Sequence, residues 1–140
     1  MNIDYSIKIK LHVECKEENI KKILVRGEQQ GFKYYDHVMG VQYSEASILD
    51  ARGATQKIIK AYKDKPEDGP CVYTILNSTT ETCAFLWFYK SDDGLLEFQM
   101  GAIGCPKKKD MFIDFDYYIR MCLDLCKDFQ ILEVRTTMDY

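Results

Sequence analysis

Patterns that would assign a function directly are missing from this sequence. It has no run of 18 consecutive apolar residues, which is about the length that a membrane-spanning helix requires. It contains no Cys-x-x-Cys, His-Glu-x-x-His, P-loop or Gly-x-Ser-x-Gly motif. Only two histidines, His12 and His37, are present as catalytic bases. The sequence therefore offers no standard signature of a membrane span, a metalloprotease, a nucleotide site or a serine hydrolase.

An excess of positive charge is also missing. The chain has 19 lysines and arginines against 22 aspartates and glutamates, which gives a formal net charge of −3. Proteins that bind nucleic acid or an anionic membrane usually carry a basic stripe. We therefore expect neither nucleic acid nor a membrane among the partners of this chain.

The six cysteines do not follow the pattern of a disulfide-stapled secreted domain. They lie in segments that otherwise have strand or helix patterns, and we expect them to be reduced. Cys122 and Cys126 are four residues apart on an apolar helix face, which favours core packing over a metal site. Residues 1–6 lead straight into an alternating strand without a basic and apolar leader. These features predict a cytoplasmic protein.

A strand that is apolar on both faces is what the sequence does contain. Residues 83–89 read Cys-Ala-Phe-Leu-Trp-Phe-Tyr. Because successive side chains of a strand point to opposite faces, both faces of this segment are apolar. Such a strand normally lies in the middle of a sheet that is covered on both sides. With 140 residues, of which 46% are hydrophobic, the chain has enough material for one domain spanning residues 1–140.

The other segments alternate between strand and helix periodicity. Asp-Gly at positions 93 and 94, between two apolar runs, predicts a hairpin. Ser44, Ser47 and Asp50 are alternative N-caps of the second helix, and Asp110 and Asp114 are alternatives for the third. The predicted fold is α+β, with helices packed on a mixed, largely antiparallel sheet. The predicted order is β-α-β-α-β-β-β-α-β, over about Tyr5–Val13, Lys16–Gln30, Phe32–Tyr43, Ala51–Tyr62, Cys71–Leu76, Cys83–Lys90, Leu95–Met100, Asp114–Lys127 and Phe129–Arg135.

Glycines and lysines cluster between the last strand of the meander and the last helix. Residues 101–109 read Gly-Ala-Ile-Gly-Cys-Pro-Lys-Lys-Lys. Glycines let backbone N–H groups turn toward an anion, and lysines near a helix start supply positive potential. This pattern predicts a site for a phosphate-bearing ligand, although a tight connection with solvated lysines also explains it. The candidate ligand-binding residues are Gly101, Gly104, Cys105, Lys107 and Lys108.

The same segment resembles a known motif. Gln99–Gly104 is similar to the Gln/Arg-x-x-Gly-x-Gly/Ala motif of the GNAT acetyltransferases, which lies between a meander and a helix. The spacing here is Gln-x-Gly-x-x-Gly, and the lysines lie outside the motif. The resemblance implies an acetyl-coenzyme A site as an alternative function. Cys105 lies beside three ammonium groups, which would lower its thiol pKa, but the sequence places neither histidine beside it as a base.

A surplus of tyrosine is the last feature. Ten tyrosines exceed the needs of a core of this size, and tyrosine is enriched at protein interfaces. If all three helices pack on one side of the sheet, the other side needs a long loop, a partner or a second copy to cover it, so a homodimer stays open. The candidate interface residues are Tyr34, Tyr35, Tyr43, Tyr117 and Tyr140.

Together these features predict a non-catalytic, cytoplasmic protein-interaction domain without a cofactor. An inhibitor or immunity-type protein that neutralises a basic partner fits the size and charge. The alternative is a small enzyme or ligand-binding domain that uses the Gly101–Lys109 loop. A third interpretation is a domain that holds an apolar ligand against Phe85, Trp87 or Phe88.

Overall fold

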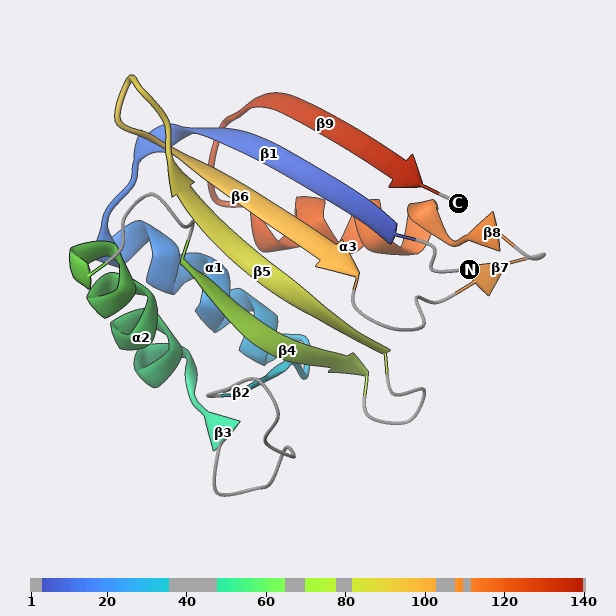
Figure 1. Ribbon diagram of the computed structural model, residues 1–140, viewed down its shortest axis with the longest axis horizontal. Coiled ribbons are helices and arrows are strands. Elements are labelled where there is room, and N and C mark those ends of the chain that lie inside the picture. The colour runs from blue at the N-terminus through green and yellow to red at the C-terminus, as the bar shows by residue number, and fades with distance from the viewer. Residues whose placement is uncertain are drawn as a thin grey trace.

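The computed structural model describes residues 4–35, 48–64, 70–77, 82–102, 108–109 and 112–139 (Figure 1). Within these residues the α+β class predicted from the sequence is confirmed. The elements in chain order are β1 (Asp4–Glu14), α1 (Glu17–Gln29), β2 (Lys33–Tyr35), β3 (Ile48–Leu49), α2 (Ala51–Asp64), β4 (Cys71–Asn77), β5 (Thr82–Lys90), β6 (Leu95–Ala102), β7 (Lys108–Lys109), β8 (Phe112–Ile113), α3 (Phe115–Leu125) and β9 (Ile131–Asp139).

Seven of these strands form one sheet in the order β3-β2-β4-β5-β6-β1-β9, and β7 pairs with β8 separately. The predicted central strand, β5, is the fourth of the seven and lies between β4 and β6. The described pairings in the seven-stranded sheet are all antiparallel, in keeping with the largely antiparallel sheet that the sequence predicted. The helix α1 connects β1 to the distant strand β2, with β4, β5 and β6 between them, so this connection does not make two parallel strands neighbours.

Local side-chain chemistry sets several element ends. Asp50 is the N-cap of α2, since its Oδ1 accepts from the Gly53 N–H at 2.7 Å. Asp114 caps α3 in the same way through the N–H of Tyr117. The strands β3, β7 and β8 have two residues each, which is too short to leave a periodic signal. Most of the strand predicted over Phe32–Tyr43 lies outside the described residues.

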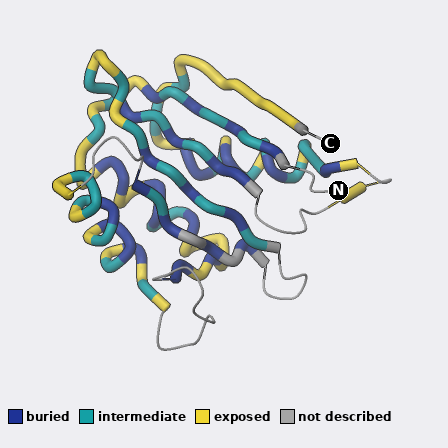
Figure 2. The backbone as a smooth tube through the Cα atoms, viewed as in Figure 1, coloured by how far each residue is buried: buried dark blue, intermediate teal, exposed yellow. Residues whose placement is uncertain are grey.

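All three described helices pack against one face of the sheet. Alternate residues of the central strands, such as Ile7 and Ile9 of β1 and Leu86 and Phe88 of β5, are fully buried in one core cluster with α1, α2 and α3. Figure 1 shows α1 and α3 passing behind the sheet, with α2 beside α1. Along β1, β5 and β6 buried residues alternate with half-buried ones (Figure 2). The helices therefore cover one face and leave the other without a helix.

The β5–β6 hairpin is held by one carboxylate. Asp93 accepts from the Nζ of Lys10 at 2.8 Å, from the Ser91 hydroxyl and from the backbone N–H of Leu95. The ammonium of Lys10 and the hydrogen bonds from Ser91 and Leu95 hold the pKa of Asp93 well below its ordinary value.

This pKa shift predicts an acid-sensitive contribution to stability. A carboxylate whose pKa is lowered by folding stabilises the protein above its unfolded-state pKa of about 3.9, and the contribution is lost as the pH falls toward the folded-state pKa. Asp93→Asn, which keeps the acceptor oxygen but loses the charge, should be less stable than wild type at neutral pH. Urea titrations should show the difference closing below about pH 4. If the stability difference between wild type and Asp93→Asn stayed the same from neutral pH to below about pH 4, the lowered pKa of Asp93 would be contradicted.

Candidate functional site

The face of the sheet opposite the helices, which we call the open face, is the candidate functional site. It carries the half-buried members of the alternating pattern in β1, β4, β5 and β6. The strand register aligns these residues in rows that cross the sheet. One row runs Tyr89–Glu97–Lys10, and the next runs Cys71–Trp87–Gln99–Lys8.

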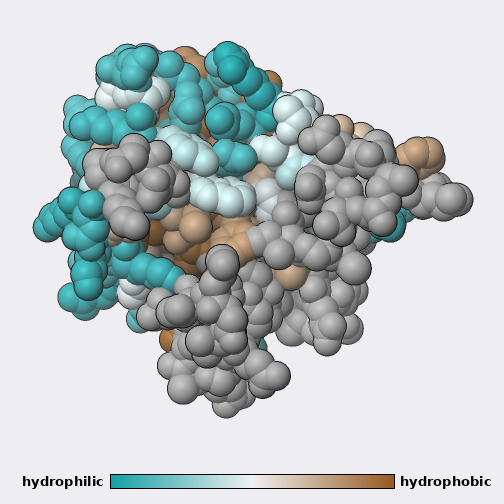
Figure 3. Space-filling model, in the orientation of Figure 1, coloured by the Kyte–Doolittle hydropathy of each residue, from teal (hydrophilic) through white to brown (hydrophobic). Residues whose placement is uncertain are grey.

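Aromatic side chains occupy the centre of the open face. Phe85, Trp87 and Tyr89 alternate along β5 and are all half-buried, and we call them the aromatic patch. The ring centroids of Phe85 and Trp87 are 5.5 Å apart, within the range of a favourable aromatic contact. Figure 3 shows hydrophobic surface near the middle of this face and hydrophilic surface toward the β1 and β9 side. The two faces of β5 are thus both apolar, as predicted, but the helices cover only one of them.

Gly101 supports the aromatic patch. It lies in β6, opposite Phe85 of β5 and Ser6 of β1. A Cβ atom at this position would lie 2.8 Å from Cζ3 of Trp87, closer than real side chains approach. The absence of a side chain at position 101 therefore gives the indole ring room to lie over β6.

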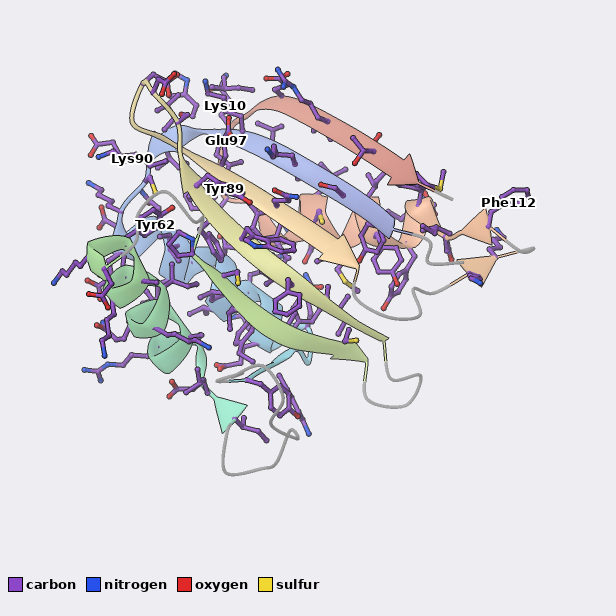
Figure 4. The ribbon with its side chains drawn as sticks, viewed as in Figure 1. Lys10, Tyr62, Tyr89, Lys90, Glu97 and Phe112 are labelled. Carbon is purple, nitrogen blue, oxygen red and sulfur yellow. The ribbon has the colours of Figure 1, made fainter. Side chains whose placement is uncertain are left out.

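Charged side chains border the aromatic patch on the β1 and β9 side. Lys8, Lys10, Glu97, Glu133 and Arg135 line a hollow of about 60 Å³, and we call them the charged row. Figure 4 shows Tyr89, Glu97 and Lys10 following one another across β5, β6 and β1. The hollow has room for only about two water molecules, so it is too small for a coenzyme or nucleotide.

Two contacts tie the charged row to its neighbours. The Nζ of Lys8 lies 5.2 Å from the ring centroid of Tyr89, which is a cation–π contact between the charged row and the aromatic patch. Gln99 donates a hydrogen bond from Nε2 to the Ser6 hydroxyl at 2.8 Å. The amide of Gln99, which begins the segment that resembles the acetyltransferase motif, is thus hydrogen-bonded to β1.

The predicted phosphate-binding residues are only partly described. Gly101 belongs to the strand β6 and has the packing role given above, so the segment from 101 does not begin as a loop. Lys108 lies in β7, is exposed and pairs with Ile113 of β8. Gly104, Cys105 and Lys107 lie outside the described residues.

Two residues of the predicted tyrosine interface, Tyr34 and Tyr35, are buried in the structure. Tyr34 is fully buried, and its hydroxyl donates to the carbonyl of Leu24 at 2.6 Å, while Tyr35 is 7% exposed. Both are therefore core residues, and the backbone acceptor satisfies the buried hydroxyl of Tyr34 without a partner protein. Tyr117 is half-buried on α3, away from the open face. Tyr43 and Tyr140 lie outside the described residues.

Cysteine chemistry does not give a competing site among the described residues. Cys122 and Cys126 lie in the core, and burial raises the pKa of the Cys126 thiol to about 12. Cys15 borders a second hollow with Tyr62 and Lys90, and its thiol donates to the Tyr62 hydroxyl at 3.5 Å. Burial raises the pKa of the Cys15 thiol, which disfavours the reactive thiolate. No group of three metal-ligating side chains occurs within the part of the chain that the structure describes.

Comparison with known proteins gives no relative. No protein-family model, curated protein or solved structure matches this chain. The described helices also include none with the length and apolar character needed to cross a bilayer.

Proposed function

We propose that this chain is a non-catalytic protein-interaction domain that binds a partner protein through the open face of its sheet. The observation that carries the proposal is the aromatic patch on a face that no described helix covers. Tryptophan and tyrosine are enriched among the residues that dominate binding energy at protein interfaces. An apolar centre beside a charged border is also the usual anatomy of such interfaces.

The charge distribution supports recognition in two steps. The net charge of −3 favours encounter with a basic partner, of the kind that an inhibitor or immunity-type protein neutralises. The charged row itself has three cationic and two anionic side chains, so the open face is not acidic locally. We infer that long-range attraction comes from the whole chain, whereas register on the open face comes from complementary charges opposite Lys8, Glu97 and Lys10.

The proposal places the protein in the cytoplasm. Cys15, Cys71, Cys122 and Cys126 are present as thiols. Proteins of a reducing compartment keep their thiols in this form, whereas small secreted domains of this size often pair them. This supports the location that the sequence predicts.

Trp87→Ala tests the proposed function. A partner is first isolated by affinity purification from cells that naturally produce this chain, identified by mass spectrometry and then purified. Because Trp87 is central to the aromatic patch, its loss should weaken the affinity by about 30-fold or more in calorimetry. Circular dichroism should show that the variant keeps its secondary structure.

Leu123→Ala is the matched control for this experiment. Leu123 is an exposed apolar residue of α3, on the helical side of the molecule. Its replacement should leave the affinity unchanged. A partner that binds wild type and Trp87→Ala equally would refute the open face as the binding site. A rise in melting temperature with coenzyme A that Lys108→Ala abolishes would instead favour the ligand-binding alternative.

A further inference from the structure

The strand β9 forms an edge of the sheet that is exposed along nearly its whole length. It pairs with β1 on one side, and the strand order ends there on the other. Every side chain from Leu132 to Met138 is exposed, which Figure 2 shows as a continuous exposed segment. The other described strands longer than two residues each bury at least one side chain. Proteins rarely leave so long an edge open, because it is a template for pairing with another strand.

We propose that β9 pairs antiparallel with β9 of a second copy of this chain, with Val134 on the two-fold axis. The resulting dimer joins the two sheets edge to edge. This inference does not depend on the proposed function, since it uses the edge of the sheet, including Glu133 and Arg135 of the charged row, and not the aromatic patch.

The charges of β9 favour a second β9 as the strand that pairs with this edge, and they also set the register of that pairing. Glu133 and Arg135 are the only charged residues between Ile131 and Met138. In a two-fold antiparallel pairing one residue lies on the axis, and residues at equal distances on either side of it face each other. With Val134 on the axis, Glu133 of each copy faces Arg135 of the other. The strand edge is therefore complementary in charge to itself.

Registers shifted by one or two residues from Val134 lose this complementarity. An axis at Glu133 places two glutamates opposite each other, and an axis at Arg135 does the same with two arginines, which is destabilising. An axis at Thr136 places Glu133 opposite Asp139, two carboxylates again. The register at Val134 gives two reciprocal ion pairs instead.

The apolar side chains of β9 fit the same register. Leu132, Val134 and Met138 are 45%, 42% and 37% exposed. Val134 belongs to the helix-side face of the sheet, since it pairs with the buried Ile9 of β1, yet no described helix covers it. In the dimer it packs against its own copy, and Leu132 faces Thr136. Burial of these side chains adds to the strand hydrogen bonds.

The ion pair that β9 already contains does not oppose the dimer. Glu133 and Arg135 of one chain contact each other, and their side chains are 45% and 72% exposed. Exposed pairs of this kind contribute little to stability. Glu133 and Arg135 can therefore give up their contact within one chain and pair with the second copy at little cost in stability. The two open faces would then lie on the same side, about 35 Å apart between β5 strands, which suits bivalent binding.

Disulfide cross-linking tests the register. Residues that face each other across an antiparallel pair have Cα atoms about 4.5–5.5 Å apart, within disulfide range. Val134→Cys should therefore give a covalent dimer under mild oxidation. Thr136→Cys is the matched control, because its counterpart would lie four residues along the strand, about 13 Å away. Wild type measures the background of cross-linking that its native cysteines give under the same oxidation.

Charge reversal tests the same interface in solution. Sedimentation equilibrium should show a wild-type dimer, and Glu133→Arg or Arg135→Glu alone should raise its dissociation constant about tenfold or more, since each places like charges opposite each other. The combined variant Glu133→Arg/Arg135→Glu restores opposite pairs and should return it to within about threefold of wild type. A wild-type monomer up to the solubility limit would overturn the proposal. So would a dimer that ignores these changes, or efficient cross-linking through Thr136→Cys but not Val134→Cys.

Discussion

Phe88→Ala should lower the free energy of unfolding by about 3–5 kcal/mol. Phe88 is on the helix-side face of β5 and is fully buried, with its ring centroid 5.6 Å from that of Phe98. Its backbone carbonyl accepts from the Tyr62 hydroxyl, so the surrounding structure is held in place and collapses poorly around a cavity. A loss of this size is a large part of the total stability of a small domain. Urea unfolding followed by circular dichroism measures it.

Phe85→Ala is the control on the same strand. Phe85 is the same residue type three positions earlier, but it points to the open face and is half-buried. Because part of its side chain already contacts solvent, its removal should cost about 1 kcal/mol. Equal losses from the two substitutions would mean that both faces of β5 are buried to the same extent, which would remove the structural basis for the open face.

The sequence predicted β5 well because its signal is local. Seven successive apolar residues identify a central strand wherever the other strands lie. The caps of α2 and α3 are equally local, since Asp50 and Asp114 contact backbone groups only three residues away. What the sequence left open was which face of β5 the helices cover, because that depends on how distant strands are ordered.

The surroundings of single candidate residues could not be predicted where they depend on distant neighbours. Gly101 has the appearance of a phosphate-loop glycine, but its partner is the ring of Trp87, 14 residues earlier and across a strand pairing. Tyr34 was predicted to bind a partner, but its hydroxyl bonds to Leu24, on the preceding helix. Neither contact leaves a pattern in a single sequence.

The last strand shows the same limit at the end of the chain. The prediction ended it near Arg135, because the apolar alternation fades there. In the structure β9 continues to Asp139, paired with Asp4 of β1. Its length is set by the length of β1, which already has a strand on its other side. An exposed strand needs no apolar pattern of its own, and the edge that carries the dimer proposal was invisible for this reason.

Gly27→Ala should also destabilise the protein strongly, by about 2–4 kcal/mol. Gly27 is buried in α1, where a Cβ atom would lie 2.7 Å from Cδ2 of Phe32 and against the hydroxyl of Tyr34. The added methyl group must push the Tyr34 hydroxyl from its buried hydrogen bond to Leu24. Alanine favours a helix over glycine by about 1 kcal/mol, which is smaller than the combined cost of overpacking and a lost buried hydrogen bond.

Gly53→Ala is the control for Gly27→Ala, because it makes the same change in helix propensity at a position with more room for a methyl group. Gly53 is half-buried in α2, and the nearest atom to an added Cβ is Oδ1 of Asp50 at 3.2 Å, so a shift of a few tenths of an ångström makes room for the methyl group and keeps the N-cap hydrogen bond. Here the helix preference of alanine should dominate and leave the free energy of unfolding unchanged or raised by up to about 1 kcal/mol.

In a Tyr34→Phe background, which removes the hydroxyl that meets the new methyl group, Gly27→Ala should cost less stability than in wild type. Thermal unfolding of wild type, the two single variants and the double variant measures this coupling, and additive losses would show that Tyr34 is not the group that excludes a side chain at position 27.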